Sequence, residues 1–198
     1  MDSQRAEKMG SRMRSVHRSS RLVDSFLSGV ALALLLGASA RACPTDAEPR
    51  AAGTVLTVQL PGQKPQSLSL AALAAWPQTT LTQRQSVASS GSGTTDRAVM
   101  YSGVLLRDVL TASGFASATD RSARTSIVEA VASDGYRAVL SWGELFNSPL
   151  GDQAVVISAQ DGKPLDAVAG PLALRSLADL RPGPRHVRNL CALVVRGL

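Results

Sequence analysis

The chain is poor in the residue types that most active sites use. Among its 198 residues are two histidines, two cysteines and only 4% aromatic residues. The cysteines are far apart, so no zinc-type spacing exists. The sequence also lacks a phosphate-binding glycine loop, an HExxH motif and a G-x-S-x-G motif. His186 is the one histidine beyond residue 42, and no motif places it in a Ser-His-Asp arrangement.

The N-terminal segment has the pattern of a secretory signal. Six basic residues lie between positions 5 and 21, an apolar run follows over residues 26–36, and small residues occupy positions 38–40 and 42. This order predicts a signal peptide over residues 1–42. The apolar run is shorter than the ~20 residues that span a bilayer. We therefore expect a periplasmic or secreted protein with no membrane span after cleavage; a retained anchor is the alternative.

Charge changes when the predicted signal is set aside. Residues 1–42 hold seven of the 21 basic residues but only three of the 15 acidic ones. The remaining chain therefore carries a net charge of +2 instead of +6. A nearly neutral domain gives no support to nucleic-acid binding, so we expect no nucleic-acid partner.

The two cysteines leave two interpretations open. Cys43 and Cys191 could pair in an oxidising compartment. However, residues 43–53 are predicted to be a flexible lead-in, and Cys191 lies in an apolar run over residues 190–195. This pattern favours a buried free thiol at Cys191. Lipidation of Cys43 is disfavoured because Arg41 stands where that processing requires small residues.

Residues 54–198 are predicted to form one α+β domain with a sheet-rich core and short helices. A hairpin signal lies at Ser133-Asp134-Gly135, and Ser141 with Glu144 has the spacing of a capping box. Residues 90–95 read as a flexible loop. Strands are expected over residues 54–60, 79–89, 127–132, 136–140, 154–159, 172–177 and 191–195, and short helices at 69–75, 106–110 and 141–144.

A basic loop is the main candidate for chemistry. Residues 181–189 contain four arginine or histidine side chains between prolines and a glycine, and guanidinium groups there could bind an oxyanion. Spacing alone favours a solvated connector.

The aromatic residues Tyr101, Tyr136 and Trp142 are interpreted as packing residues, although the Tyr136 hydroxyl could reach a pocket. Four carboxylates are interpreted as structural because they occupy turn or cap positions: Asp134, Glu144, Asp161 and Asp166.

Five stretches in order resemble the molybdopterin-binding domain of the sulfite oxidase family. Tyr101-Ser102-Gly103-Val104 opens the first stretch and resembles the aromatic-x-G-V start of the family's segment. The resemblance implies a sulfite oxidase-type fold, a molybdopterin cofactor and pterin-phosphate binding at Arg185, His186 and Arg188. The five stretches are residues 101–110, 134–136, 161–165, 170–175 and 185–190.

One departure from the family bears on the chemistry. The family's molybdenum-binding cysteine precedes the aromatic-x-G segment, where this chain offers Ser86, Ser89, Ser90 and Ser92. A hydroxyl is a harder donor than a thiolate, so molybdenum binding is doubtful. The segment before the apolar run also lacks an adjacent arginine pair, which suggests export as an unfolded chain without a preloaded cofactor.

Three functions stay open at this point. The leading hypothesis is an exported, oxidoreductase-like domain that binds a pterin-like or other small anionic ligand, or an exported protein partner. The first alternative is a working molybdopterin-dependent oxidoreductase. The second is a structural or signalling interaction domain.

Overall fold

The computed structural model describes residues 43, 53–88, 94–115, 121–181 and 183–197. The predicted signal peptide, most of the lead-in and residues 90–93 of the predicted loop lie outside these residues. No helix of the described part is long and apolar enough to cross a membrane.

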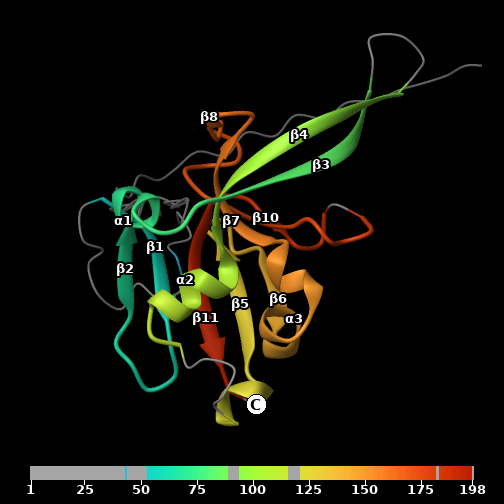
Figure 1. The fold of residues 1–198 in the computed structure, drawn as a ribbon. Coiled ribbons are helices and arrows are strands. Elements are labelled where there is room, and N and C mark those ends of the chain that lie inside the picture. Colours follow the sequence, from blue (N-terminus) through green and yellow to red (C-terminus); the bar gives the residue numbers. More distant parts are fainter. Residues whose placement is uncertain (1–42, 44–52, 89–93, 116–120, 182, 198) are drawn as a thin grey trace, which may run out of the picture. The chain divides into compact units, whose positions relative to one another are not determined.

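Sheet A is built from the two ends of the described chain and one central hairpin (Figure 1). β1 and β11 run parallel, and the remaining neighbours are antiparallel. The hairpin forms where the turn residues Ser133-Asp134-Gly135 predict it, and Gly135 takes a φ of 90°. In spatial order the strands are β2 (Gln66–Ser69), β1 (Thr54–Gln59), β11 (Leu190–Arg196), β5 (Ile127–Ala132) and β6 (Arg137–Ser141).

Sheet B is antiparallel and carries a long hairpin, β3–β4, which extends away from the other strands in Figure 1. At Gly103 a Cβ atom would collide with the carbonyl oxygen of Val156 on β7, so only glycine allows β4 and β7 to approach there. The order is β10 (His186–Val187), β9 (Ala173–Ser176), β7 (Ala154–Gln160), β4 (Thr94–Leu105) and β3 (Thr79–Ala88), with β8 (Lys163–Pro164) paired to β7.

Side-chain caps start two of the short helices. The hydroxyl of Ser69 accepts the backbone N–H of Ala72, and Ser141 with Glu144 forms the predicted capping box. These bonds satisfy N–H groups that a helix start leaves without partners. The helices are α1 (Leu70–Ala74), α2 (Leu106–Ala112) and α3 (Trp142–Phe146), and the 3-10 turns are η1 (Ser122–Thr125) and η2 (Pro149–Asp152).

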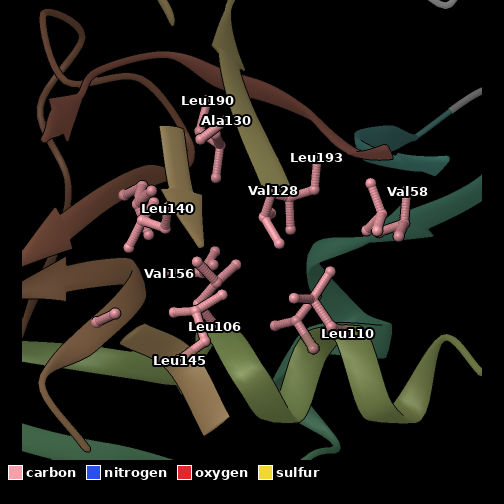
Figure 2. Close-up of a cluster of buried hydrophobic side chains, with 14 of the residues drawn as sticks. Val58, Leu106, Leu110, Val128, Ala130, Leu140, Leu145, Val156, Leu190 and Leu193 are labelled. Carbon is pink, nitrogen blue, oxygen red and sulfur yellow. The ribbon is translucent and has the colours of Figure 1, made fainter. Parts of the chain in front are cut away.

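One hydrophobic core joins both sheets and the helices. Figure 2 shows Val128 beside Leu193 in sheet A, and Val156 of sheet B beside Leu106 and Leu145 of the helices. β11 is buried on both faces, and its residues Leu193 and Val195 face this core together with Val128 and Ala130 of β5. The described part is therefore sheet-rich with few short helices, which confirms the α+β expectation.

The cysteines correct one prediction. Cys43 and Cys191 form a disulfide with a Cα–Cα distance of 6.1 Å, so the interpretation of Cys191 as a free thiol is wrong. β11, which contains Cys191, is the parallel neighbour of β1, which follows Cys43 in the chain. This proximity depends on sheet topology, and the spacing of the two cysteines in the sequence does not reveal it.

The seven predicted strands are all present, but the structure adds β2, β8 and a long strand, β4, that were not predicted. β4 begins at Thr94 and continues to Leu105, whereas residues 94 and 95 are predicted as loop and residues 96–105 are not predicted as a strand. Long-range pairing with both β3 and β7 stabilises this strand, which explains why local composition does not indicate it. The predicted link between the last strands also contains the short strand β10.

Candidate anion-binding site

The second half of the basic loop contains β10, which pairs with β9 at the edge of sheet B. In β10, His186 lies opposite Arg175 of β9, and Val187 lies opposite Leu174. Residues on paired positions of neighbouring strands share one face of a sheet. The loop therefore places His186 beside a second basic residue that is distant in the sequence.

Arg185 is held by two carboxylates. Its Nε donates to Oδ2 of Asp179 at 3.0 Å, and its Nη1 donates to Oε1 of Glu144 at 2.6 Å. The hydrogen bond with Asp179 is the main reason why the pKa of Arg185 is raised, and Glu144 adds to it. We call Asp179, Arg185 and Glu144 the clamp, because together they tie the basic loop to α3.

Glu144 serves the clamp and the helix start at once. Oε2 accepts the backbone N–H of Ser141 at 2.7 Å, while Oε1 binds Arg185. Burial pushes the pKa of Glu144 up, but the hydrogen bonds from Ser141 and Arg185 outweigh burial and leave the pKa lowered. The carboxylate thus stays ionised and keeps both contacts at neutral pH.

A cavity of about 310 Å³ opens beside the basic loop. The Tyr136 hydroxyl donates to the carbonyl oxygen of Pro184 at 2.8 Å, so one wall is tied to the loop. Asp134 accepts the backbone N–H of Tyr136 at 2.9 Å and thereby serves the turn. Arg188 is exposed and has no carboxylate partner among the described residues. The lining residues are Ala132, Asp134, Tyr136, Gly183, His186 and Arg188.

Arg175 brings a buried cation to the same neighbourhood. Only 6% of its surface is exposed, and its guanidinium lies 4.6 Å from the centre of the Tyr101 ring. One Nη donates to Oε1 of Gln83 at 2.9 Å, while the buried Nε has no partner among the described residues. Burial, together with the charge of Arg188, lowers the pKa of Arg175.

His186 is neutral at pH 7. Burial and then the charges of Arg175 and Arg188 lower its pKa from 6.5 to about 4. We call Arg175, His186 and Arg188 the basic cluster. Arg175 and Arg188 are two cations without a carboxylate partner in the described chain, against the single carboxylate of Asp134 in the cavity lining, so the local balance of charge favours an anion.

The structure thus separates the three predicted site residues. His186 and Arg188 line one cavity, whereas Arg185 belongs to the clamp. Sequence reasoning did not select Arg175 or Gln83 as site residues. An arginine that follows Leu172-Ala173-Leu174 was the available signal, because a charge inside an apolar strand needs a specific environment.

The packing interpretation is wrong for Tyr136, which is 44% exposed and lines the cavity, whereas the other side-chain interpretations hold. Tyr101 and Trp142 are buried, and Trp142 stacks on Phe146. Asp161 accepts the backbone N–H of Met100 at 2.9 Å, and Asp166 accepts the backbone N–H groups of two residues in its own turn. Together with Asp134 and Glu144, these carboxylates serve the backbone as predicted.

The described residues offer few metal ligands. No group of three or more His, Cys, Asp or Glu side chains among them could hold an ion. The Ser86 hydroxyl donates to Asp96 at 2.6 Å, and both cysteines are committed to the disulfide. Ser89, Ser90 and Ser92 lie outside the described residues.

Comparison with known proteins supports the fold. No family model and no curated protein sequence matches the chain. Among solved structures, the chain is similar to the sulfane dehydrogenase SoxCD from Paracoccus pantotrophus, with a TM-score of 0.51 and 15% identity. The match covers 71% of this chain and 37% of that chain. At this identity the likeness shows a shared fold.

Proposed function

We propose that this protein is an exported domain of sulfite oxidase type that binds a small anionic ligand, pterin-like or otherwise, at the basic cluster. Five ordered sequence motifs and the shared fold with a sulfane dehydrogenase support the family. The observation that carries the binding role is the cavity lined by His186 and Arg188, beside a buried Arg175 without a carboxylate partner in the described chain.

Each cavity residue has a distinct part in this proposal. The Arg188 guanidinium supplies positive charge and two parallel donors to an oxyanion. The neutral imidazole of His186 donates one further N–H. Tyr136 fixes the facing wall through its bond to Pro184. The clamp holds the loop in place, so Arg185 acts on the ligand only through the position of its neighbours.

A sulfite oxidase-type domain implies a molybdopterin cofactor, and the described residues fit only its anionic part. Arg188 and His186 suit a phosphate group. Molybdenum in this family takes a cysteine thiolate, and the two cysteine sulfurs of this chain are joined to each other. The donor set therefore does not fit the metal, and the proposed function contains no redox step.

Calorimetric titration with inorganic phosphate and with a pterin phosphomonoester tests the proposal. A hydrogen bond to a charged group contributes ~1.5–3 kcal/mol, so Arg188→Ala should weaken binding about tenfold to a hundredfold. Arg181→Ala removes the same charge from the same loop at a position that does not line the cavity, and it should leave binding nearly unchanged.

The other outcomes select the alternatives. Equal losses from Arg181→Ala and Arg188→Ala would overturn the cavity as the site, as would the absence of binding to both probes. Stoichiometric molybdenum in protein purified from its native compartment would favour the working oxidoreductase. Binding of an exported protein that both arginine variants leave intact would favour the interaction domain.

A further inference from the structure

The disulfide lies at the predicted cleavage site of the signal peptide. Cys43 is the first residue after the predicted signal, and its partner Cys191 lies 148 residues further along the chain. The two Cα atoms are 6.1 Å apart, within the range that disulfide geometry requires. They are the only cysteines of the chain, so neither has another disulfide partner in it.

Both cysteines are buried in the fold. Cys43 is 3% exposed and Cys191 4% exposed. They form one buried cluster with Val131 of β5 and with Ala192 and Val194 of β11. Cys43 therefore contributes an apolar contact to sheet A in addition to the covalent bond.

This placement conflicts with a lipid anchor. A lipidated cysteine carries its acyl chains on the same sulfur and must lie at the bilayer surface. The Cys43 sulfur can form a thioether or a disulfide but not both, and acylation would leave a buried thiol at Cys191. Moving Cys43 to a membrane would also expose the apolar surface that it covers, which costs about 25 cal/mol per Å².

We propose that Cys43 is oxidised to the Cys191 disulfide after export in place of acylation, so the mature protein is released unlipidated with its first residue fixed to β11. The two thiols lose two protons and two electrons as the S–S bond forms. Exchange with a protein disulfide of the oxidising compartment accepts them, and that disulfide leaves as two thiols.

The inference does not rest on the proposed function, because no residue of the basic cluster takes part. It predicts that the domain completes its covalent structure outside the reducing cytoplasm. Closing a loop of this length is expected to stabilise the fold, because the disulfide restricts the unfolded chain.

Intact-mass analysis and thiol alkylation of the full chain test the inference, after expression in an export-competent bacterium with lipoprotein machinery. We expect the soluble fraction to contain protein without a lipid mass. Without reductant no cysteine should be alkylated, and after reduction both should be. Peptide mapping should show residue 43 linked to residue 191.

Two results would overturn the inference: a diacylglyceryl mass on Cys43 in the membrane fraction, or alkylation of both cysteines before reduction. Cys191→Ser is the matched variant, and it should expose one alkylatable thiol at Cys43. Because the decisive measurement uses the unaltered chain, poor folding of this variant does not affect the outcome.

Discussion

Arg185 of the clamp and His186 of the basic cluster are adjacent in the chain, but the two groups differ in how their positive charges are neutralised. In the clamp, the guanidinium of Arg185 meets two carboxylates. In the basic cluster, Arg175 and Arg188 have no carboxylate partner among the described residues, and His186 loses its proton. The comparison predicts that Arg185 serves stability, whereas Arg188 of the same loop serves the proposed anion binding.

Removing Arg185 should give the largest effect on stability. Arg185→Met leaves Asp179 and Glu144 without their cation, and breaking a partly buried ion pair costs about 2 kcal/mol, between the surface and buried limits. Urea unfolding measures this loss. Arg185→Lys keeps the charge without the two-sided fork and should lose about half as much. A loss below about 0.5 kcal/mol in Arg185→Met would contradict the clamp.

Replacing Arg175 should change the free energy of unfolding much less than replacing Arg185 does. Arg175→Met removes the cost of burying a cation that has no carboxylate partner in the described chain, and it also removes the contact with the Tyr101 ring and the hydrogen bond to Gln83. We therefore expect the net change in the free energy of unfolding to lie within about 1 kcal/mol of zero. The same Arg175→Met change should raise the pKa of His186, since one of its two neighbouring cations is gone. NMR titration of the imidazole measures that shift. An unchanged pKa would show that the charge of Arg175 does not act on His186.

The pH dependence of stability should reveal His186. Its pKa is about 4 in the fold against 6.5 for the free group, so the unfolded chain binds more protons between these values. The free energy of unfolding should therefore fall as the pH is lowered from 7 to 5, by an amount on the order of 1 kcal/mol after allowance for solvent screening.

His186→Gln provides the control for that measurement. Its amide does not titrate, so its stability should change less between pH 7 and pH 5. Glu129 and Glu144 titrate below their usual value of 4.5 because their pKa values are lowered, and they add little in this window. Equal pH dependence in both proteins would exclude His186 as the source.

Removing one hydroxyl of the cavity wall should give the smallest effect. Tyr136→Phe loses the hydrogen bond to the Pro184 carbonyl, which contributes ~0.5–1.5 kcal/mol in general and less at an exposed position. We expect a destabilisation near the lower limit and a loss of anion affinity of only a few-fold. A loss as large as that of Arg188→Ala would show that Tyr136 contacts the ligand directly.

Local signals in the sequence predicted much of the fold. Capping at Ser69 and Ser141, the turn at Ser133-Asp134-Gly135 and the β-branched residues of β1 each depend on neighbouring residues. β4 was missed because its stability comes from pairing with β3 and β7. The disulfide was missed for the same reason, since sheet topology brings its partners together across 148 residues.

The candidate site could be predicted only in part. Composition indicated the basic loop, and the resemblance selected Arg185, His186 and Arg188. The division of these residues depends on Glu144, which is 41 residues from Arg185, and on the pairing of β9 with β10. No periodicity in the sequence encodes either contact, so the role of Arg185 in the clamp required the structure.

The most direct test of anion binding at the basic cluster is a heteronuclear NMR titration of the protein with inorganic phosphate. The account predicts saturable shifts at His186, Arg188 and Tyr136, little change at Asp179, and loss of these shifts in Arg188→Ala. Shifts that persist in Arg188→Ala, or that gather at the clamp instead, would contradict the assignment of anion binding to the basic cluster.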